Sequence, residues 1–205
     1  LVDMNSGYLY IHPFLNREER WGGLAVSASG SRQDLEEATS CLLREAKDTL
    51  IGHSLPWFIP AGITNEEAAP DTAQNAVFLF RQPENDADDE YQESADAIRS
   101  SGAQTGLILN PNLNPPTEGP NWDYLVLETN HARVLTPIKL LLLATKSKMI
   151  LTGVKTRMDF EWALANQAAL VDPEFLIHRD KRANKPDVLR MHILQLLSLL
   201  TQDAD

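Results

Sequence analysis

The chain has 205 residues, of which 43% are hydrophobic and 23% charged, so it fits one folded domain with a short appendage and excludes disordered and low-complexity proteins. Its formal net charge of −11 opposes binding to nucleic acid or anionic lipid, and no apolar stretch is long enough to span a bilayer. A single cysteine, Cys41, allows no internal disulfide, and the sequence shows no signal peptide. We therefore expect a cytoplasmic protein that contacts neither nucleic acid nor membrane.

The first half of the chain is predicted to open with a β-hairpin. Two runs rich in aromatic and apolar residues, 8–14 and 20–27, flank a polar turn, as is typical of hairpins. Apolar residues at three- and four-residue spacing then predict a helix over 31–50. Short apolar runs predict strands at 55–59 and 76–80.

Strands and helices continue to alternate in the second half. Strands are predicted at 105–109, 124–128 and 149–152, and 170–171 together with 175–178 supplies the last one. One helix is predicted to end near residue 102, and two further helices are predicted over 134–145 and 156–166. Such alternation requires crossover connections and predicts an α/β fold with a mostly parallel sheet, either an open doubly wound sheet or a closed barrel.

The chain ends in a predicted helix that starts at Pro186, after a basic turn. Leu189, Ile193, Leu196 and Leu200 form one apolar stripe along it, which we expect to pack against the rest of the domain or a second copy. The absence of an initial methionine and the abrupt end lead us to expect a segment of a longer protein.

Two surface segments are candidates for contact with a protein partner. Residues 84–96 carry many acidic residues and no basic residue. The first turn of a solvated helix explains this composition best, because acids are favourable at a helix N-terminus. An acidic docking surface is the alternative explanation, and a calcium-binding loop fits the sequence less well. Residues 110–123 form a loop rich in proline and asparagine. The candidate contact residues are Asp88, Asp89, Glu90, Pro115 and Pro116.

The common sequence signatures of catalysis are missing from the chain. The five histidines are scattered without metal-ligand spacing, and there is no phosphate-binding loop, dinucleotide fingerprint or nucleophile elbow. Only Glu128 places a carboxylate at a predicted strand end, where an ion-pair partner is a more common role than a catalyst. We therefore expect no bound metal and no cofactor.

Several segments in chain order resemble a known family. Residues 149–163, MILTGVKTRMDFEWA, resemble the penultimate strand and helix of bacterial EAL domains, the cyclic di-GMP (c-di-GMP) phosphodiesterases. Residues 10–17 and 21–26 together resemble the family's opening hairpin with its Glu-Ala-Leu signature. Residues 100–107 resemble the strand that precedes the paired aspartates, and residues 123–128 resemble the Lys-x-Asp strand. The resemblance implies a slightly trimmed TIM-type (β/α) barrel with its ligand site at the carboxyl ends of the strands.

The resemblance also implies a division of the chain. Residues 1–185 correspond to the EAL-like barrel with its N-terminal hairpin. Residues 186–205 are similar to the helical connector that leads from an EAL-like domain into an HDOD domain. We therefore expect an HDOD domain in the same, longer protein.

The family's chemistry requires carboxylates at strand ends to hold two divalent ions. Carried over by position, most of its metal-binding and catalytic residues are replaced here by side chains that cannot bind a hard cation, and the Gln-Gly motif falls near Asp172. The degenerate catalytic positions are Ala25, Pro60, Arg81, Ile108, Leu109, Glu128 and Thr152, with Val126 at the position of the family's lysine.

Three functions compete on these grounds. The favoured one is a pseudoenzyme, a regulatory module that acts through protein–protein interaction. The second is a sensor that binds c-di-GMP without hydrolysing it, for which Arg81, Arg133 and Lys155 are the available cations. The third, an active phosphodiesterase, is disfavoured by the missing ligands. A different α/β regulator is the remaining interpretation if the resemblance does not hold.

Overall fold

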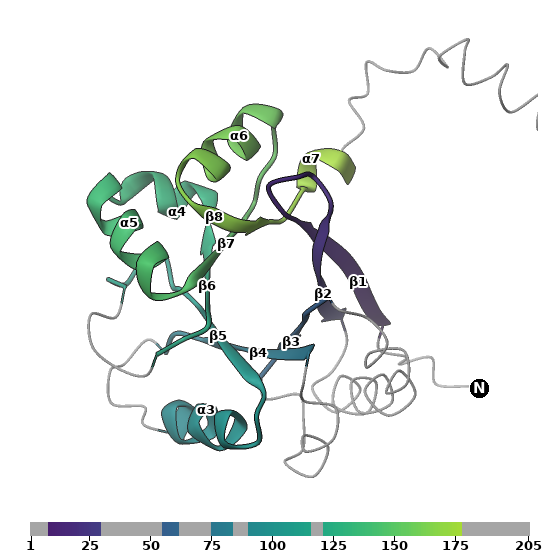
Figure 1. Ribbon diagram of the computed structural model, residues 1–205, viewed down its shortest axis with the longest axis vertical. Helices are drawn as coiled ribbons and strands as arrows, with labels where there is room; N and C mark the ends of the chain where they lie inside the picture. The colour runs from purple at the N-terminus through teal and green to yellow at the C-terminus, as the bar shows by residue number, and fades with distance from the viewer. Residues whose placement is uncertain (1–7, 30–54, 62–74, 84–89, 116–120, 178–205) are drawn as a thin grey trace, which may run out of the picture.

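Short, mostly buried strands form the wall of a closed barrel (Figure 1). The computed structural model describes residues 8–29, 55–61, 75–83, 90–115 and 121–177. Its strands are β1 (Tyr8–Leu15), β2 (Trp21–Ser29), β3 (Trp57–Pro60), β4 (Ala76–Arg81), β5 (Gln104–Ile108), β6 (Tyr124–Glu128), β7 (Lys148–Thr152) and β8 (Ala168–Val171). They follow one another around the barrel in chain order, which confirms the barrel and excludes the open sheet.

The predicted N-terminal hairpin is confirmed and provides the one antiparallel strand of the barrel. β1 pairs with β2 from Tyr8 opposite Ser29 to Leu15 opposite Trp21, whereas β2 to β8 run parallel. In the turn between them, the Asn16 side chain accepts hydrogen bonds from the backbone amides of Glu18 and Arg20, at 3.1 and 3.0 Å. The barrel closes where Leu15 of β1 pairs with Val171 of β8.

Alternation of side chains along the strands divides the core into two parts. One buried cluster contains Phe14, Ala25, Phe58, Val77, Leu79, Tyr124, Val126, Ile150 and Leu170. Intervening residues such as Ile59, Phe78 and Leu127 belong to a larger cluster that includes helix residues. The first cluster therefore fills the barrel, and the second joins the barrel to its helices.

The described helices lie outside the barrel wall (Figure 1). They are α3 (Glu90–Ser100), α4 (Thr129–Val134), α5 (Pro137–Lys146), α6 (Arg157–Ala165) and α7 (Glu174–Ile177). On α6, Phe160 is fully buried, and Trp162 and Leu164 pack against the core cluster to which the β7 residues Met149 and Leu151 belong.

Two predictions about secondary structure are wrong. The predicted helix 134–145 corresponds to α5 but begins three residues too early, because Thr136 caps the helix and Pro137 starts it, and the short helix α4 before it was not predicted. The predicted strand 175–178 is helical over its described residues: α7 covers Glu174–Ile177, and β8 ends at Val171. Pro173, which has no amide hydrogen for a sheet ladder, lies between them.

Several predictions fall outside the described residues. These are the helix over 31–50 with Cys41, the acidic segment 84–89 and the helix from Pro186. Among the described residues, no helix is both long enough and apolar enough to cross a membrane.

Candidate functional site

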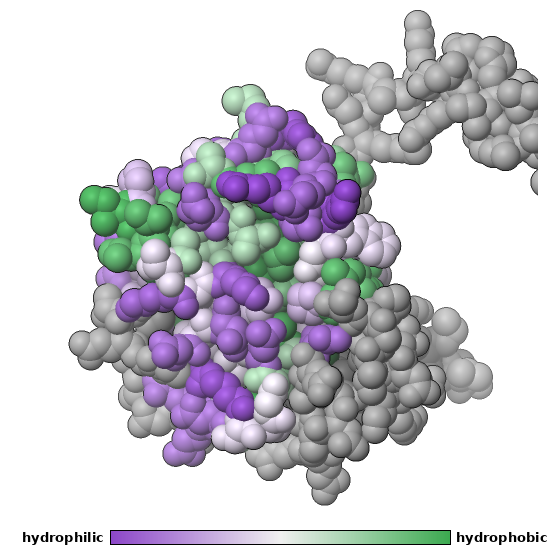
Figure 2. All heavy atoms as spheres, viewed as in Figure 1, coloured by the Kyte–Doolittle hydropathy of each residue, from purple (hydrophilic) through white to green (hydrophobic). Residues whose placement is uncertain are grey.

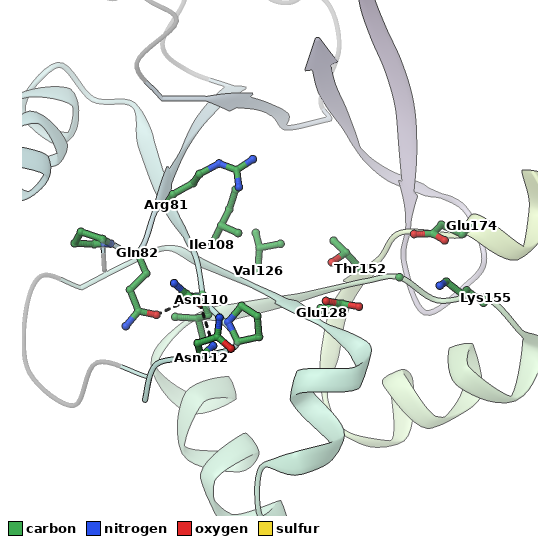
Figure 3. A pocket seen from close by; sticks show the side chains of 14 residues that line it. Arg81, Gln82, Ile108, Asn110, Asn112, Val126, Glu128, Thr152, Lys155 and Glu174 are labelled. Carbon is green, nitrogen blue, oxygen red and sulfur yellow. Dashed lines mark hydrogen bonds between the residues drawn. The ribbon is translucent and has the colours of Figure 1, made fainter. Parts of the chain in front are cut away.

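The carboxyl ends of four neighbouring strands, β4 to β7, surround a cavity of about 950 Å³ (Figure 3). Ligand sites of β/α barrels lie at this end of the strands. The cavity is lined by Arg81, Gln82, Pro83, Ile108, Leu109, Asn110, Pro111, Asn112, Val126, Glu128, Thr152, Gly153, Lys155 and Glu174.

Strand alternation explains which side chains reach the cavity. Along β4, Val77 and Leu79 point into the barrel, so the next residue of the same parity, Arg81, lies at the mouth. The same rule places Glu128 above Val126 on β6. Thr152 on β7 and Ile108 on β5 complete this ring, so the barrel interior is apolar and the mouth mixes charged, polar and apolar side chains.

One side of the mouth is a loop held by amide side chains. Gln82 follows β4; its Oε1 accepts from the Asn110 amide at 3.1 Å, and its Nε2 donates to the Asn114 carbonyl at 3.0 Å. The Asn110 Oδ1 accepts from the Asn112 amide at 3.0 Å and closes a tight turn. These bonds fix the β5 loop against the end of β4 (Figure 3).

The other side of the mouth is formed where β6 and β7 end. Glu128 is exposed and its Oε1 accepts from Asn130 Nδ2 at 3.3 Å. Thr129 donates its hydroxyl to the Thr152 carbonyl at 2.7 Å, which ties the two strand ends together. The predicted ion-pair role of Glu128 is not observed within the described part of the chain, where no salt bridge to it is present.

The charges around the mouth do not converge. Arg81 and Lys155 are the basic lining residues, and Glu128 and Glu174 the acidic ones, with apolar side chains of β5 and β6 between them. Within the described ranges, no three His, Cys, Asp or Glu side chains are grouped closely enough to hold a metal ion. The arrangement offers hydrogen bonds and two cations to an anionic molecule, and few oxygen ligands to a cation.

A partly buried carboxyl follows the end of β8. Asp172 Oδ2 is 3.9 Å from His12 Nε2, and its side chain is 17% exposed. Burial raises the pKa of Asp172; the nearby His12 opposes this rise and Glu174 adds to it. Asp172 is therefore a group whose ionisation is costly in the folded protein.

The structure brings together five of the seven positions that the resemblance assigned to catalysis. Arg81, Ile108, Leu109, Glu128 and Thr152 all line the cavity, together with Val126. Ala25 and Pro60 do not line it. Ala25 packs inside the barrel opposite Phe58, and Pro60 ends β3, where it pairs with Leu79.

The residues proposed for other roles lie elsewhere. Of the candidate partner surface, Asp88, Asp89 and Pro116 lie outside the described residues, Glu90 is the first residue of α3, and Pro115 is half-buried. Arg133 does not line the cavity: its Nη2 is 2.5 Å from Asp159 Oδ1, and its guanidinium stacks over Trp162.

Sequence reasoning missed several lining residues. Gln82, Asn110, Asn112, Gly153 and Glu174 all lie within a few residues of the end of a strand. That position is the signal that could have identified them, because carboxyl ends of parallel strands meet at one face of a barrel.

No protein-family model and no curated protein matches this sequence. Solved structures with a similar fold include a standalone versatile EAL protein of Vibrio cholerae O395 in its c-di-GMP-bound form. This match has 12% identity and a TM-score of 0.59, and it covers 82% of this chain and 90% of that one. The YkuI protein of Bacillus subtilis, which has an EAL domain and was solved with its substrate c-di-GMP and calcium, also has 12% identity and a TM-score of 0.59, over 98% of this chain and 63% of that one.

A third similar structure is the S helix-GGDEF-EAL part of Vibrio cholerae LapD bound to c-di-GMP, with 12% identity and a TM-score of 0.58. The match covers 80% of this chain and 52% of that one, so this chain spans about half of the LapD chain. At these identities the comparisons establish the fold: the chain folds as an EAL-like barrel.

Proposed function

We propose that this chain is a catalytically inactive EAL-like module that acts through protein–protein contacts in bacterial signalling, in the cytoplasm. The observation that carries the proposal is the composition of the barrel mouth. Where the family resemblance requires carboxylates, the strand ends present Arg81, Ile108, Leu109 and Thr152 to the cavity.

The physical argument is one of coordination. Mg²⁺ and Ca²⁺ each take about six oxygen ligands, so two ions need a dense set of carboxylates and carbonyls. The mouth offers Glu128 from β6 and Glu174 from α7, and Arg81 would repel a cation. Without bound ions, a water molecule keeps its ordinary high pKa and the developing charge on phosphorus is not neutralised.

The test is a hydrolysis assay with purified chain, c-di-GMP and either Mg²⁺ or Mn²⁺, with a hydrolytically active EAL domain as the positive control. We expect no product above the protein-free rate. Metal-dependent hydrolysis that Glu128→Ala abolishes would overturn the proposal.

A second candidate function is supported by one feature of the cavity. Its volume of about 950 Å³ admits a ligand, its basic lining residues Arg81 and Lys155 each offer a cation to an anionic group, and the similar structures named above contain c-di-GMP. A sensor of this kind would bind c-di-GMP without metal. Isothermal titration calorimetry of the chain with c-di-GMP tests this function. Binding without metal that Arg81→Ala and Lys155→Ala each weaken at least ~10-fold would establish the sensor, and Arg20→Ala serves as the control variant.

The wider architecture is also a proposal. We infer that residues 186–205 connect this barrel to an HDOD domain in a longer protein, and that the partner is a protein. The sequence-predicted surface at Asp88, Asp89, Glu90, Pro115 and Pro116 stays a prediction. Charge reversal of the three acids with replacement of both prolines should weaken partner binding if that surface is used.

A further inference from the structure

The helices between β6 and β7 expose a row of large apolar side chains. Val134, at the end of α4, is 84% exposed, and Ile138, Leu141 and Leu142 on α5 are 72%, 55% and 56% exposed. We call these four residues the α5 face. Figure 2 shows hydrophobic residues gathered on the surface where Figure 1 places α5.

The fold of the barrel does not account for the α5 face. Helix α5 already anchors itself through Leu140, which is 3% exposed, and through the partly buried Leu143 and Ala144. Ile138, Leu141 and Leu142 lie at positions i, i+3 and i+4, so they form one continuous stripe on the opposite side. A stripe of this kind on a solvent-exposed helix is typical of an interaction surface.

The charged residues of α4 and α5 themselves have one sign. Between Glu128 and Asp159 the sequence contains no acidic residue, although the whole chain has a net charge of −11. Lys139 and Lys146 on α5 are exposed, and neither forms a salt bridge within the described ranges. The stripe is therefore flanked by cations that an incoming partner can pair with.

We propose that the α5 face docks an amphipathic helix of a partner protein whose apolar stripe is flanked by Asp or Glu. This inference rests on the proposed function, because it names the surface and partner chemistry of a protein-interaction module. The apolar stripes would bury each other, and the acidic flanks would pair with Lys139 and Lys146.

The same charges disfavour two other occupants. A second copy of the chain docking through the same face would add Lys139 and Lys146 twice and no acidic residue of α4 or α5, and like charges across an interface are costly. An anionic membrane would be repelled by the net charge of −11, and α5, with ten residues, offers a short apolar surface for interfacial binding.

The test uses two fluorescent helical peptides and the whole chain. Both peptides carry leucines at i, i+3, i+4 and i+7; one has glutamates and the other lysines at the flanking positions. Fluorescence anisotropy should show binding of the glutamate peptide, with the lysine peptide at least ~10-fold weaker. The affinity for the glutamate peptide should fall with added salt.

Substitutions locate the site. Leu141→Glu and, independently, Ile138→Glu should each weaken binding of the glutamate peptide at least ~10-fold, as expected for an apolar anchor. Lys139→Glu with Lys146→Glu should weaken it and invert the preference between the peptides. Met158→Glu is the matched control, since Met158 is 79% exposed on a different helix, α6. Circular dichroism checks that each variant is folded.

Four results would overturn the proposal: no binding of the glutamate peptide, equal binding of both peptides, dimerisation of the chain that Leu142→Glu abolishes, or binding to anionic lipid vesicles that Leu141→Glu abolishes. The proposed function fails separately. Metal-dependent hydrolysis of c-di-GMP would overturn the inactive module while leaving peptide binding at the α5 face intact.

Discussion

Gly153 turns the chain at the mouth of the barrel, directly after β7. Its φ is +69°, a conformation that costs an L-residue about 1–2 kcal/mol, and a Cβ there would lie 3.4 Å from Glu128 Cγ. We expect Gly153→Ala to lower the free energy of unfolding by about 1–2 kcal/mol, as measured by urea denaturation. Gly153→Asn should cost less, because asparagine tolerates this region; an equal loss in both variants would contradict the argument.

Asp172 gives a prediction about pH. Burial raises its pKa in the folded protein above the ordinary 3.8. The folded protein is therefore most stable, as far as this group is concerned, below pH 3.8, where Asp172 is protonated. This contribution to the free energy of unfolding is lost as the pH rises through the raised pKa. Asp172→Asn should therefore become more stable relative to the parent as the pH increases from about 3.5 to 7. Denaturation of both proteins across this range measures the difference, and a difference that does not change with pH would contradict the prediction.

At the scale of single residues, the sequence predicted the strand ends better than the loops. Arg81, Glu128 and Thr152 were found because a strand end is visible as the last residue of an apolar run. Gln82 and Asn110 were missed because their role depends on hydrogen bonds between two loops that are 28 residues apart. No local pattern encodes such a contact.

Helix α6 depends on its first turn. Thr156 accepts a hydrogen bond from the Asp159 amide at 3.1 Å, and the Asp159 carboxylate accepts from the Thr156 amide, which together form a capping box. We expect Thr156→Ala to destabilise the protein by about 1 kcal/mol and Thr156→Ser to retain most of the stability. Equal losses in the two variants would show that the hydroxyl is not what matters.

The same capping box makes α6 sensitive to acid. The Thr156 hydroxyl, and the nearby Arg133, hold the pKa of Asp159 below its ordinary 3.8, against a smaller effect of burial. A lowered pKa contributes stability at neutral pH that is lost as the pH falls through that value. Asp159→Asn should therefore reduce stability at pH 7, and its difference from the parent should shrink as the pH is lowered below 3.8, as measured by thermal unfolding.

Helices and strands were predicted correctly where a local sequence pattern is enough to define them. The strands 124–128 and 149–152 match β6 and β7 because both are short apolar runs between polar residues. The start of α5 is marked in the sequence by Thr136 as a cap and Pro137 as the first residue, so the predicted start at 134 was too early, and α4 has only six residues and shows no clear period. Segment 175–178 was read as a strand although four residues are too few to show a period.

At the scale of the whole molecule, the seam between β1 and β8 is the thinnest part of the wall. One pair, Leu15 with Val171, joins these strands, and a bidentate ion pair from Arg157 to Glu19 bridges the β1–β2 turn to α6 at 2.6 and 2.7 Å. Hydrogen bonding to Arg157 lowers the pKa of Glu19, so this bridge is lost as the pH falls through that lowered value.

The seam predicts where the barrel opens first. Amides of β1 and β2 should show lower protection against hydrogen exchange than those of β6 and β7, because a detached hairpin has little stability of its own. Glu19→Gln should accelerate exchange in the hairpin alone. Glu161→Gln, which removes a second partner of Arg157 within α6, is the control. Uniform protection around the barrel would contradict the prediction.

Closure of the barrel was one of two predicted topologies, and the sequence could not choose between them. The alternation of strands and helices is the same in an open doubly wound sheet and in a barrel. The choice is made by the register between strands, including the pairing of Leu15 with Val171, which is 156 residues away along the chain. The family resemblance favoured the barrel, and the structure confirms it.

The apolar cluster that fills the barrel has an evolutionary consequence. Inside the barrel the ring of Phe58 contacts Phe14 in a tilted arrangement and Tyr124 edge to face, with ring centroids 5.2 and 5.0 Å apart. Residues at the mouth, such as Arg81 and Glu128, are exposed and carry little of this packing. Selection can therefore replace the mouth one residue at a time without unfolding the protein, so a lineage can abandon one chemistry and keep the scaffold for another use.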